Sequence, residues 1–102
     1  MTFRSESLRR TVASLPCAYC NVEGLSQTAH SNLYEHGKGR GLKSSDAATF
    51  PLCATTPGRV GCHDKFDQYK LCSKAEMPEM TARFITWTHI QLVERGLLKV
   101  HR

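Results

Sequence analysis

The segment PLCATTPGRVGCHDKFD, residues 51–67, carries the residues from which the rest of the chain is best interpreted. It contains two cysteines, Cys53 and Cys62, then His63 directly after the second cysteine and Asp67 four residues later. Cysteine thiolates are ligands for zinc. Residues four apart share one face of a helix, so His63 and Asp67 lie together if a helix begins near Cys62. The segment therefore predicts a structural metal beside a face that carries an imidazole and a carboxylate.

A second pair of cysteines lies upstream, in Cys17-Ala18-Tyr19-Cys20. Two thiolates separated by two residues can reach one tetrahedral ion, because the turn between them aims both sulfurs to the same side. With Cys53 and Cys62 this pair predicts a structural site of four cysteines and one Zn²⁺. A redox-active dithiol or a disulfide is the alternative interpretation of the same motif.

The spacing within the second pair is unusual for a zinc site. Eight residues, 54–61, separate Cys53 from Cys62, and the turn-forming Thr55, Pro57 and Gly58 among them predict a loop that returns the chain. The fifth cysteine, Cys72, has no close partner in sequence. We expect it to be a small buried hydrophobic residue that could replace a ligand if the long loop misplaced one.

Length and charge limit the classes of function. The chain has 102 residues, which is typical of one domain, and a chain of this size buries only about two thirds of its unfolded surface, so a metal would add useful stability. Its 14 Lys and Arg against 9 Asp and Glu give a net charge of +5. Such an excess favours a polyanionic partner such as DNA, although solvated surface charge explains it equally well.

The predicted location is a reducing cytoplasm. The first ten residues contain no apolar run of a secretory signal, and no stretch has the roughly 20 apolar residues of a membrane span. An odd number of cysteines, five, also favours metal ligands over a disulfide framework. The sequence leaves the oligomeric state open, with a homodimer as one alternative.

The pattern along the chain predicts three parts of a single α+β domain. Residues 1–14 form a basic arm or short helix, residues 15–72 a zinc-stapled core, and residues 78–96 a C-terminal helix followed by a short closing strand from Leu97 to Val100. Within the core we expect strands over 27–34 and 47–52. Between them lies a glycine-rich loop whose cations, suited to phosphate contact, are Lys38, Arg40 and Lys43.

Packing faces can also be predicted for both expected helices. In the helix that begins at Cys62, Phe66 and Tyr69 are expected to point inward while Lys70 shares the face of His63 and Asp67. In the C-terminal helix the large apolar residues are expected to lie in the core; they are Met80, Phe84, Trp87 and Val93.

Taken together, AHSN at 29–32, GKGRGLKSSD at 37–46, PLC at 51–53 and GCHDKFD at 61–67 resemble the HNH nucleases of phages and prophages. The likeness is greatest to the small prophage nucleases of the YbcO-like family, and it runs from the first cysteine pair to the C-terminal WTHIQLVERGLLKV. The resemblance implies a ββα-metal finger, in which a two-stranded hairpin and a helix hold one divalent ion. It also implies an endonuclease that hydrolyses DNA phosphodiester bonds.

The resemblance assigns roles to individual residues. His30 would be the general base, and a neutral imidazole near pH 7 suits that role. His63 and Asp67 would hold the catalytic Mg²⁺ or Mn²⁺, so both imidazoles are expected to face a common cavity. Two positions depart from the pattern of many HNH enzymes: Ala29 stands where a metal ligand often precedes the base, and Ala48 replaces the middle Asn. Asp46 or Asn32 is the alternative residue for holding the hairpin.

Three functions can be weighed against these residues, and the third is disfavoured. The first is a metal-dependent endonuclease, and the second is a zinc-stapled nucleic-acid-binding module without catalysis. The third is a zinc hydrolase or deaminase, which requires an open position on zinc and a Glu acid/base; four cysteine ligands leave no such position. The first two differ in whether His30 and His63 are needed.

Overall fold

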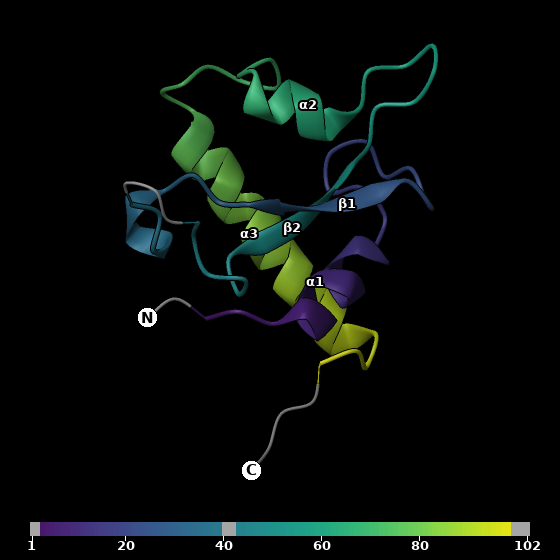
Figure 1. Cartoon of the computed structure of the whole chain (residues 1–102), viewed down its shortest axis with the longest axis vertical. Coiled ribbons are helices and arrows are strands. Elements are labelled where there is room, and N and C mark those ends of the chain that lie inside the picture. Colours follow the sequence, from purple (N-terminus) through teal and green to yellow (C-terminus); the bar gives the residue numbers. More distant parts are fainter. Residues whose placement is uncertain (1–2, 40–42, 99–102) are drawn as a thin grey trace.

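Two short antiparallel strands form the centre of the fold. The computed structural model describes residues 3–39 and 43–98. Strand β1 (Ser26–His30) pairs with β2 (Thr49–Cys53), and three helices surround the pair: α1 (Glu6–Ala13), α2 (Cys62–Asp67) and α3 (Met77–Glu94). A single 3-10 turn, η1 (Tyr34–His36), lies in the connection between the strands. In Figure 1 the long helix α3 crosses behind the sheet, with α2 above it and α1 below. An α+β fold is therefore confirmed.

The register of the hairpin assigns its side chains to two faces. Ala29 lies opposite Phe50, and His30 lies opposite Thr49. Because side chains alternate along a strand, Ala29 and Phe50 point to one face while His30 points to the other. The face of His30 is directed toward α1, since Thr28 on that face donates a hydrogen bond of 2.5 Å to the carbonyl of Arg9.

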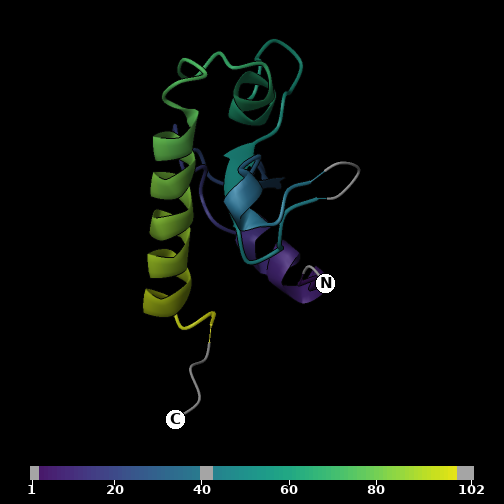
Figure 2. The ribbon, with the colours of Figure 1, turned by 90° about the vertical axis from the view of Figure 1, so that its left-hand side faces the viewer.

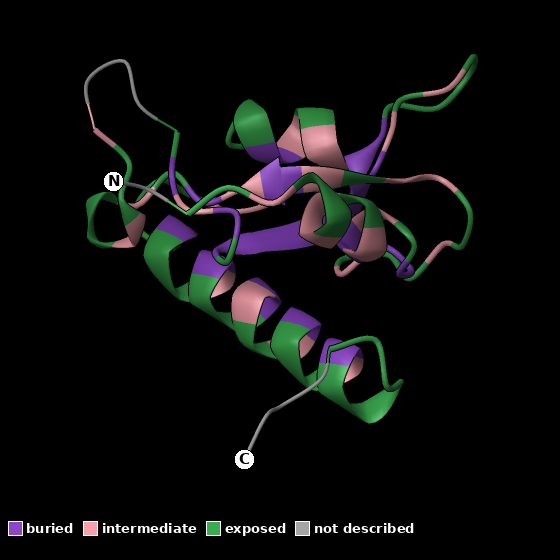
Figure 3. Cartoon of the chain, turned by 60° about the horizontal axis from the view of Figure 1, so that its bottom comes forward, coloured by how far each residue is buried: buried purple, intermediate pink, exposed green. Residues whose placement is uncertain are grey.

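The main core lies on the face of Phe50. Its ring is 5.3 Å from that of Phe66 on α2 and 5.2 Å from that of Phe84 on α3, measured between centroids. A smaller cluster of Val12, Leu15 and Leu92 connects α1 to α3. All of β2 is buried, as the purple strand in Figure 3 shows, whereas the outer side of α3 is exposed.

The N-terminal segment is a packed helix. Ser5 caps α1 by accepting a hydrogen bond from the backbone N–H of Leu8, and Glu6 stands in the first turn, where a negative charge is favourable. Val12 of this helix is buried. Of the two alternatives considered for residues 1–14, the short helix is therefore the one found for residues 6–13.

The strands and the second helix differ from the sequence prediction at their ends. The strand expected over 27–34 ends at His30, and the one expected over 47–52 lies two residues later at its start. Helix α2 ends at Asp67, and Tyr69 adopts a left-handed φ of 57°. Tyr69 is therefore exposed instead of packed inward, and Lys70 lies beyond the helix.

The C-terminal helix begins with Pro78 in its first turn and ends two residues before Gly96. Phe84 lies in the core as expected, but Val93 is half exposed and Trp87 is only half-buried. No strand follows in the described residues 97–98, and Val100 lies outside the described part of the chain. Among the helices described, none is both long and apolar enough to cross a membrane.

Candidate metal centre and cationic cavity

Four cysteines meet where the end of β2 adjoins the start of α2. The sulfurs of Cys17, Cys20, Cys53 and Cys62 all lie within 4.8 Å of one another. The sulfurs of Cys20 and Cys53 are 3.7 Å apart, close to the edge of about 3.8 Å that a tetrahedron with zinc–sulfur bonds of about 2.3 Å requires. The prediction that these four residues are placed to hold one metal ion is confirmed. Cys72 lies apart from this set, partly buried against the core.

The eight-residue spacer between Cys53 and Cys62 forms a narrow turn. Thr56 and Arg59 pair across it through two hydrogen bonds of 3.0 Å, and Gly58 supplies the left-handed φ of 83° that the turn needs. Gly61 lies so close to Ala54 that a Cβ there would come within 2.3 Å of its carbonyl carbon. The two ends of this loop therefore lie close together, and the cysteine at each end reaches the same site.

The same turn carries a cation to the sulfurs. Arg59 donates from Nη1 to Cys53 Sγ at 3.4 Å and from Nη2 to Cys20 Sγ at 3.3 Å. Four thiolates around Zn²⁺ leave a net charge of −2, so one guanidinium offsets half of it. Sequence analysis missed Arg59; a basic residue inside the cysteine loop was the available signal.

Without a metal, the thiols in this cluster ionise very unequally. Burial acts to raise the pKa of Cys20, but hydrogen bonds from the Val22 N–H, Arg59 and neighbouring thiols hold the pKa at about 6. Burial, followed by the hydrogen bond with Cys53, raises the pKa of Cys62 above its ordinary value. Four sulfurs so close together cannot all be negative unless a cation joins them, which is the condition that zinc binding meets.

His30, the predicted general base, is joined to a buried carboxylate. Its Nε2 lies 2.8 Å from Oδ1 of Asp46, whose side chain is 1% exposed. The same carboxylate accepts hydrogen bonds from Arg9 Nη1 at 2.5 Å, Arg4 Nη1 at 3.1 Å and the Ser5 N–H at 2.7 Å. Asp46 therefore connects β1, α1 and the segment after the glycine-rich loop, which is the hairpin-holding role considered for it from sequence.

Asp46 is ionised at neutral pH. Burial acts to raise its pKa, but the hydrogen bonds from His30, the Ser5 N–H, Arg9 and Arg4 outweigh burial and hold the pKa well below its usual range. Because an ionised carboxylate only accepts, Nε2 of His30 must carry the hydrogen. In the neutral imidazole the lone pair is therefore on Nδ1.

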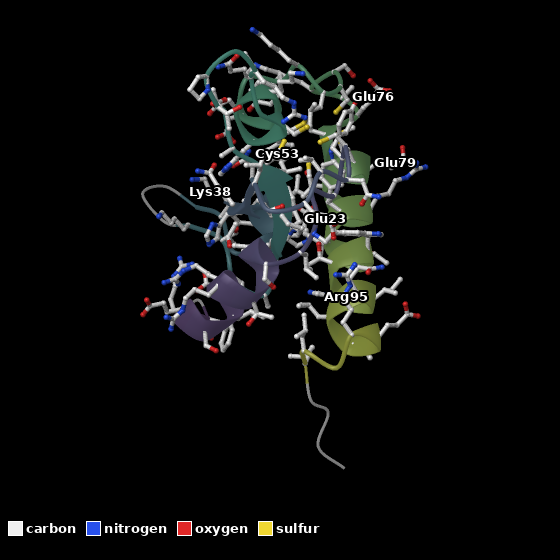
Figure 4. All side chains as sticks on the ribbon, turned by 90° about the vertical axis from the view of Figure 1, so that its right-hand side faces the viewer. Glu23, Lys38, Cys53, Glu76, Glu79 and Arg95 are labelled. Atoms are coloured by element: carbon white, nitrogen blue, oxygen red, sulfur yellow. The ribbon has the colours of Figure 1, made fainter. Side chains whose placement is uncertain are left out.

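A small cavity opens beside this pair. It has a volume of about 240 Å³ and is lined by Arg4, Arg9, His30, Lys43 and Asp46. Three permanent cations surround one carboxylate there, so the cavity carries excess positive charge. Of the predicted phosphate contacts, Lys43 lines it, while Lys38 is exposed on the side of the molecule away from Glu79 and Arg95 of α3, as Figure 4 shows. Arg40 lies outside the described residues.

The predicted ligands of the catalytic ion lie on α2. Nε2 of His63 is 3.8 Å from Oδ2 of Asp67, too far for a hydrogen bond but close enough for both atoms to bind one ion with bonds of about 2.1 Å. Nδ1 of His63 lies 2.9 Å from Oε1 of Gln27 on β1, a neighbour that sequence analysis missed. Ala29, on the same face of β1, adds no ligand. In the described residues the only gathering of three or more His, Cys, Asp or Glu ligands is the four-cysteine set.

The two histidines are held on opposite sides of β1. His63 contacts Gln27, and His30 lies three residues further along the strand, so the two contacts are on opposite faces. His63 does not line the cavity that His30 lines. The structure thus gathers His30, Asp46 and Lys43 on one side and His63 with Asp67 on the other, and it does not place both imidazoles in the expected common cavity.

The cysteine site and the cavity also lie at opposite ends of the hairpin. Cys53 pairs with Ser26 at one end and Thr49 with His30 at the other, a separation of about 13 Å at roughly 3.3 Å per residue.

Comparisons of the chain with family models, with curated proteins and with solved structures gave no match. What these sites do must therefore be inferred from their own chemistry.

Proposed function

We propose that this protein binds nucleic-acid phosphates in the cationic cavity and hydrolyses phosphodiester bonds there, with His30 as general base. The observation that supports this most is the His30–Asp46 pair inside a cavity lined by Arg4, Arg9 and Lys43. A base held in one tautomer beside several cations suits the attack of water on a phosphate.

Each residue of the cavity has a part in that reaction. Nδ1 of His30 accepts the proton from water, and Asp46 stabilises the imidazolium that forms. The guanidinium groups of Arg4 and Arg9 are each partly exposed, so each can bind phosphate oxygens while still contacting Asp46. Lys43 adds a further positive charge for the pentavalent transition state.

The proposal also assigns a divalent ion to α2. Nε2 of His63 and Oδ2 of Asp67 would hold it, while Gln27 Oε1 contacts Nδ1 of the same imidazole. A set of so few protein ligands suits Mg²⁺, which commonly keeps waters and takes phosphate oxygens as its other ligands. When bound, such an ion would supply positive charge to a phosphate that contacts this face of α2.

Nicking of supercoiled plasmid tests the proposal directly. Zinc-loaded protein should relax the plasmid when Mg²⁺ or Mn²⁺ is added and not when it is withheld. His30→Ala should reduce the rate by about 10²-fold or more, since a positioned general base contributes that much. His89→Ala is the matched control, because His89 lies on α3, does not line the cationic cavity, and forms its hydrogen bond with the Ala47 carbonyl. If His30→Ala cuts as fast as the parent protein, His30 is not the base.

A second function is favoured by one observation, the placement of His30 and His63 on opposite faces of β1. It is nucleic-acid binding without cleavage, with the cationic cavity serving as a phosphate contact. In that case no divalent ion produces nicking, and His63→Ala leaves DNA affinity unchanged in fluorescence anisotropy. Arg9→Gln should weaken binding and reduce its dependence on salt. A nuclease instead loses cutting in His63→Ala while binding persists, so the two functions are separated by one pair of assays.

A further inference from the structure

Helix α3 has apolar side chains on two faces, and only one of them is covered. Phe84, Thr88 and Leu92 face the core. On the outer face Ile90 is 46% and Val93 50% exposed. Figure 2 shows α3 along one side of the molecule, with no other described element on its outer side. Exposed apolar residues gathered along one helix face are typical of an interaction surface.

This outer face has a shape that can receive another helix. A shallow hollow of about 390 Å³ is lined by Glu79, Ala82, Arg83, Thr86, Trp87 and Ile90. A second, of about 330 Å³, is lined by His89, Ile90, Val93 and Glu94. Ile90 therefore stands between two apolar hollows, as a knob between holes does on packing helices.

The charges on this face indicate what covers it. Arg83 and Glu94 are eleven residues apart, about three helical turns, so they lie on the same side of α3 with the apolar residues between them. Arg83 pairs only with Glu79, and both side chains are mostly exposed, so that ion pair contributes little and can be exchanged. Within residues 3–39 and 43–98 Glu94 forms no ion pair.

We propose that this face binds a second copy of the chain, with the two α3 helices packed antiparallel about a two-fold axis near residues 88 and 89. Positions 83 and 94 are symmetric about that axis, so Arg83 of each copy lies opposite Glu94 of the other. Positions 87 and 90 are symmetric too, so Trp87 meets Ile90 of the other copy. An isologous interface requires a surface that complements itself in this way.

The dimer leaves the cationic cavity of each copy accessible. Figure 2 shows α1, whose Arg9 lines the cavity, on the inner side of α3 and away from its outer face. The two cavities therefore face away from the shared helices. A single pair of helices forms a small interface, so the expected dissociation constant is on the order of 10–100 µM.

Sedimentation velocity on the full zinc-loaded chain, from about 5 to about 500 µM, measures the dimer. The parent protein should change from monomer to dimer across this range, and Ile90→Glu should weaken association at least about tenfold by placing a charge at the centre of the interface. Val60→Glu is the matched control, because Val60 is 52% exposed and lies in the 54–61 turn. A parent protein that stays monomeric, or a dimer that Ile90→Glu leaves unchanged, overturns the proposal.

Charge exchange tests the antiparallel arrangement itself. Arg83→Glu and Glu94→Arg should each weaken the dimer, because each places like charges opposite one another. The double variant should restore parental association, since it only exchanges the partners. Circular dichroism and zinc content verify that each variant folds. If the double variant is no better than either single one, the helices are not paired in this register and the proposal fails.

Discussion

Replacing Asp46 by Asn tests whether one buried carboxylate holds the N-terminal helix and His30 in place. The substitution keeps the shape of the side chain and removes its charge. An amide can still accept at one position, but its NH₂ group then replaces one acceptor oxygen. Wherever the amide is oriented, that NH₂ faces N–H donors, from Arg9 and Ser5 on one side or from Arg4 and His30 on the other.

The exposure of the two arginines determines how much stability Asp46→Asn should lose. Removing one partner of a buried ion pair typically costs about 3–5 kcal/mol. The partners here can recover some hydration, because the side chains of Arg4 and Arg9 are 42% and 37% exposed. We therefore expect a loss near the lower limit, about 3 kcal/mol in the free energy of unfolding at pH 7. The free energy of unfolding of a domain is about 5–15 kcal/mol in total, so this loss is a substantial part of it.

The pH dependence follows from the lowered pKa of Asp46. A carboxyl whose pKa is lower in the folded state stabilises the fold above its unfolded pKa, near 3.8, and loses that contribution as the pH falls toward the folded pKa. The difference in the free energy of unfolding between parent and Asp46→Asn should thus be fully present above about pH 5. It should shrink below about pH 4.

Urea unfolding followed by circular dichroism measures this difference. With a slope of about 1.5 kcal/mol/M, a loss of 3 kcal/mol lowers the midpoint by about 2 M. Asp67→Asn is the matched control, because its carboxylate is mostly exposed and lies 3.8 Å from its one ionic neighbour. This variant should change the free energy of unfolding by less than about 0.5 kcal/mol. An Asp46→Asn midpoint within error of the parent would show that the carboxylate does not hold α1 and β1 together.

Two further predictions concern the cysteine site. Cys72→Ser should retain one zinc per chain by atomic absorption. Cys20→Ser should lose tight zinc binding and unfold when a chelator is added, because folding and metal binding are coupled. Equal zinc loss in both variants would contradict the assigned ligand set. Arg59→Gln should release zinc at a higher pH than the parent, since Arg59 lowers the pKa of both Cys20 and Cys53 and protons compete better without it. Arg95→Gln is its control on α3, and an unchanged pH midpoint would exclude a role for Arg59.

The metal ligands could be predicted from sequence because their signal is local and chemical. The Cys17–Cys20 spacing is a known zinc motif, and few other roles suit a second cysteine pair in a short basic chain. Even the eight-residue spacer was recognisable as a turn, from its Pro57 and Gly58. The hairpin and the two later helices were also predicted, since hydrophobic patterning and turn residues identify elements better than their ends.

The remaining features depend on contacts between distant residues. No local pattern shows that Asp46 accepts from Arg4 and Arg9, some forty residues earlier, or that Gln27 meets His63. Val93 was expected in the core because it is large and apolar, yet the helix has two apolar faces and the sheet covers only one. Sequence alone does not say which face that is.

The separation of the two candidate sites limits what a metal at the four cysteines can hold in place. The initial hypothesis was that a structural metal anchors the whole catalytic face. The four cysteines instead lie beside the start of α2. They can position His63, which follows Cys62 directly, and Asp67 one turn later on the same helix. His30 lies at the other end of the hairpin, where Asp46 and the arginines around α1 hold it. No cysteine lines the cavity, so the side chains that contact phosphate there are not those around the metal site. Cleavage in the cavity that also used an ion on α2 would need one substrate to contact both faces of β1, and this is why the effect of His63→Ala on cutting decides between the two functions.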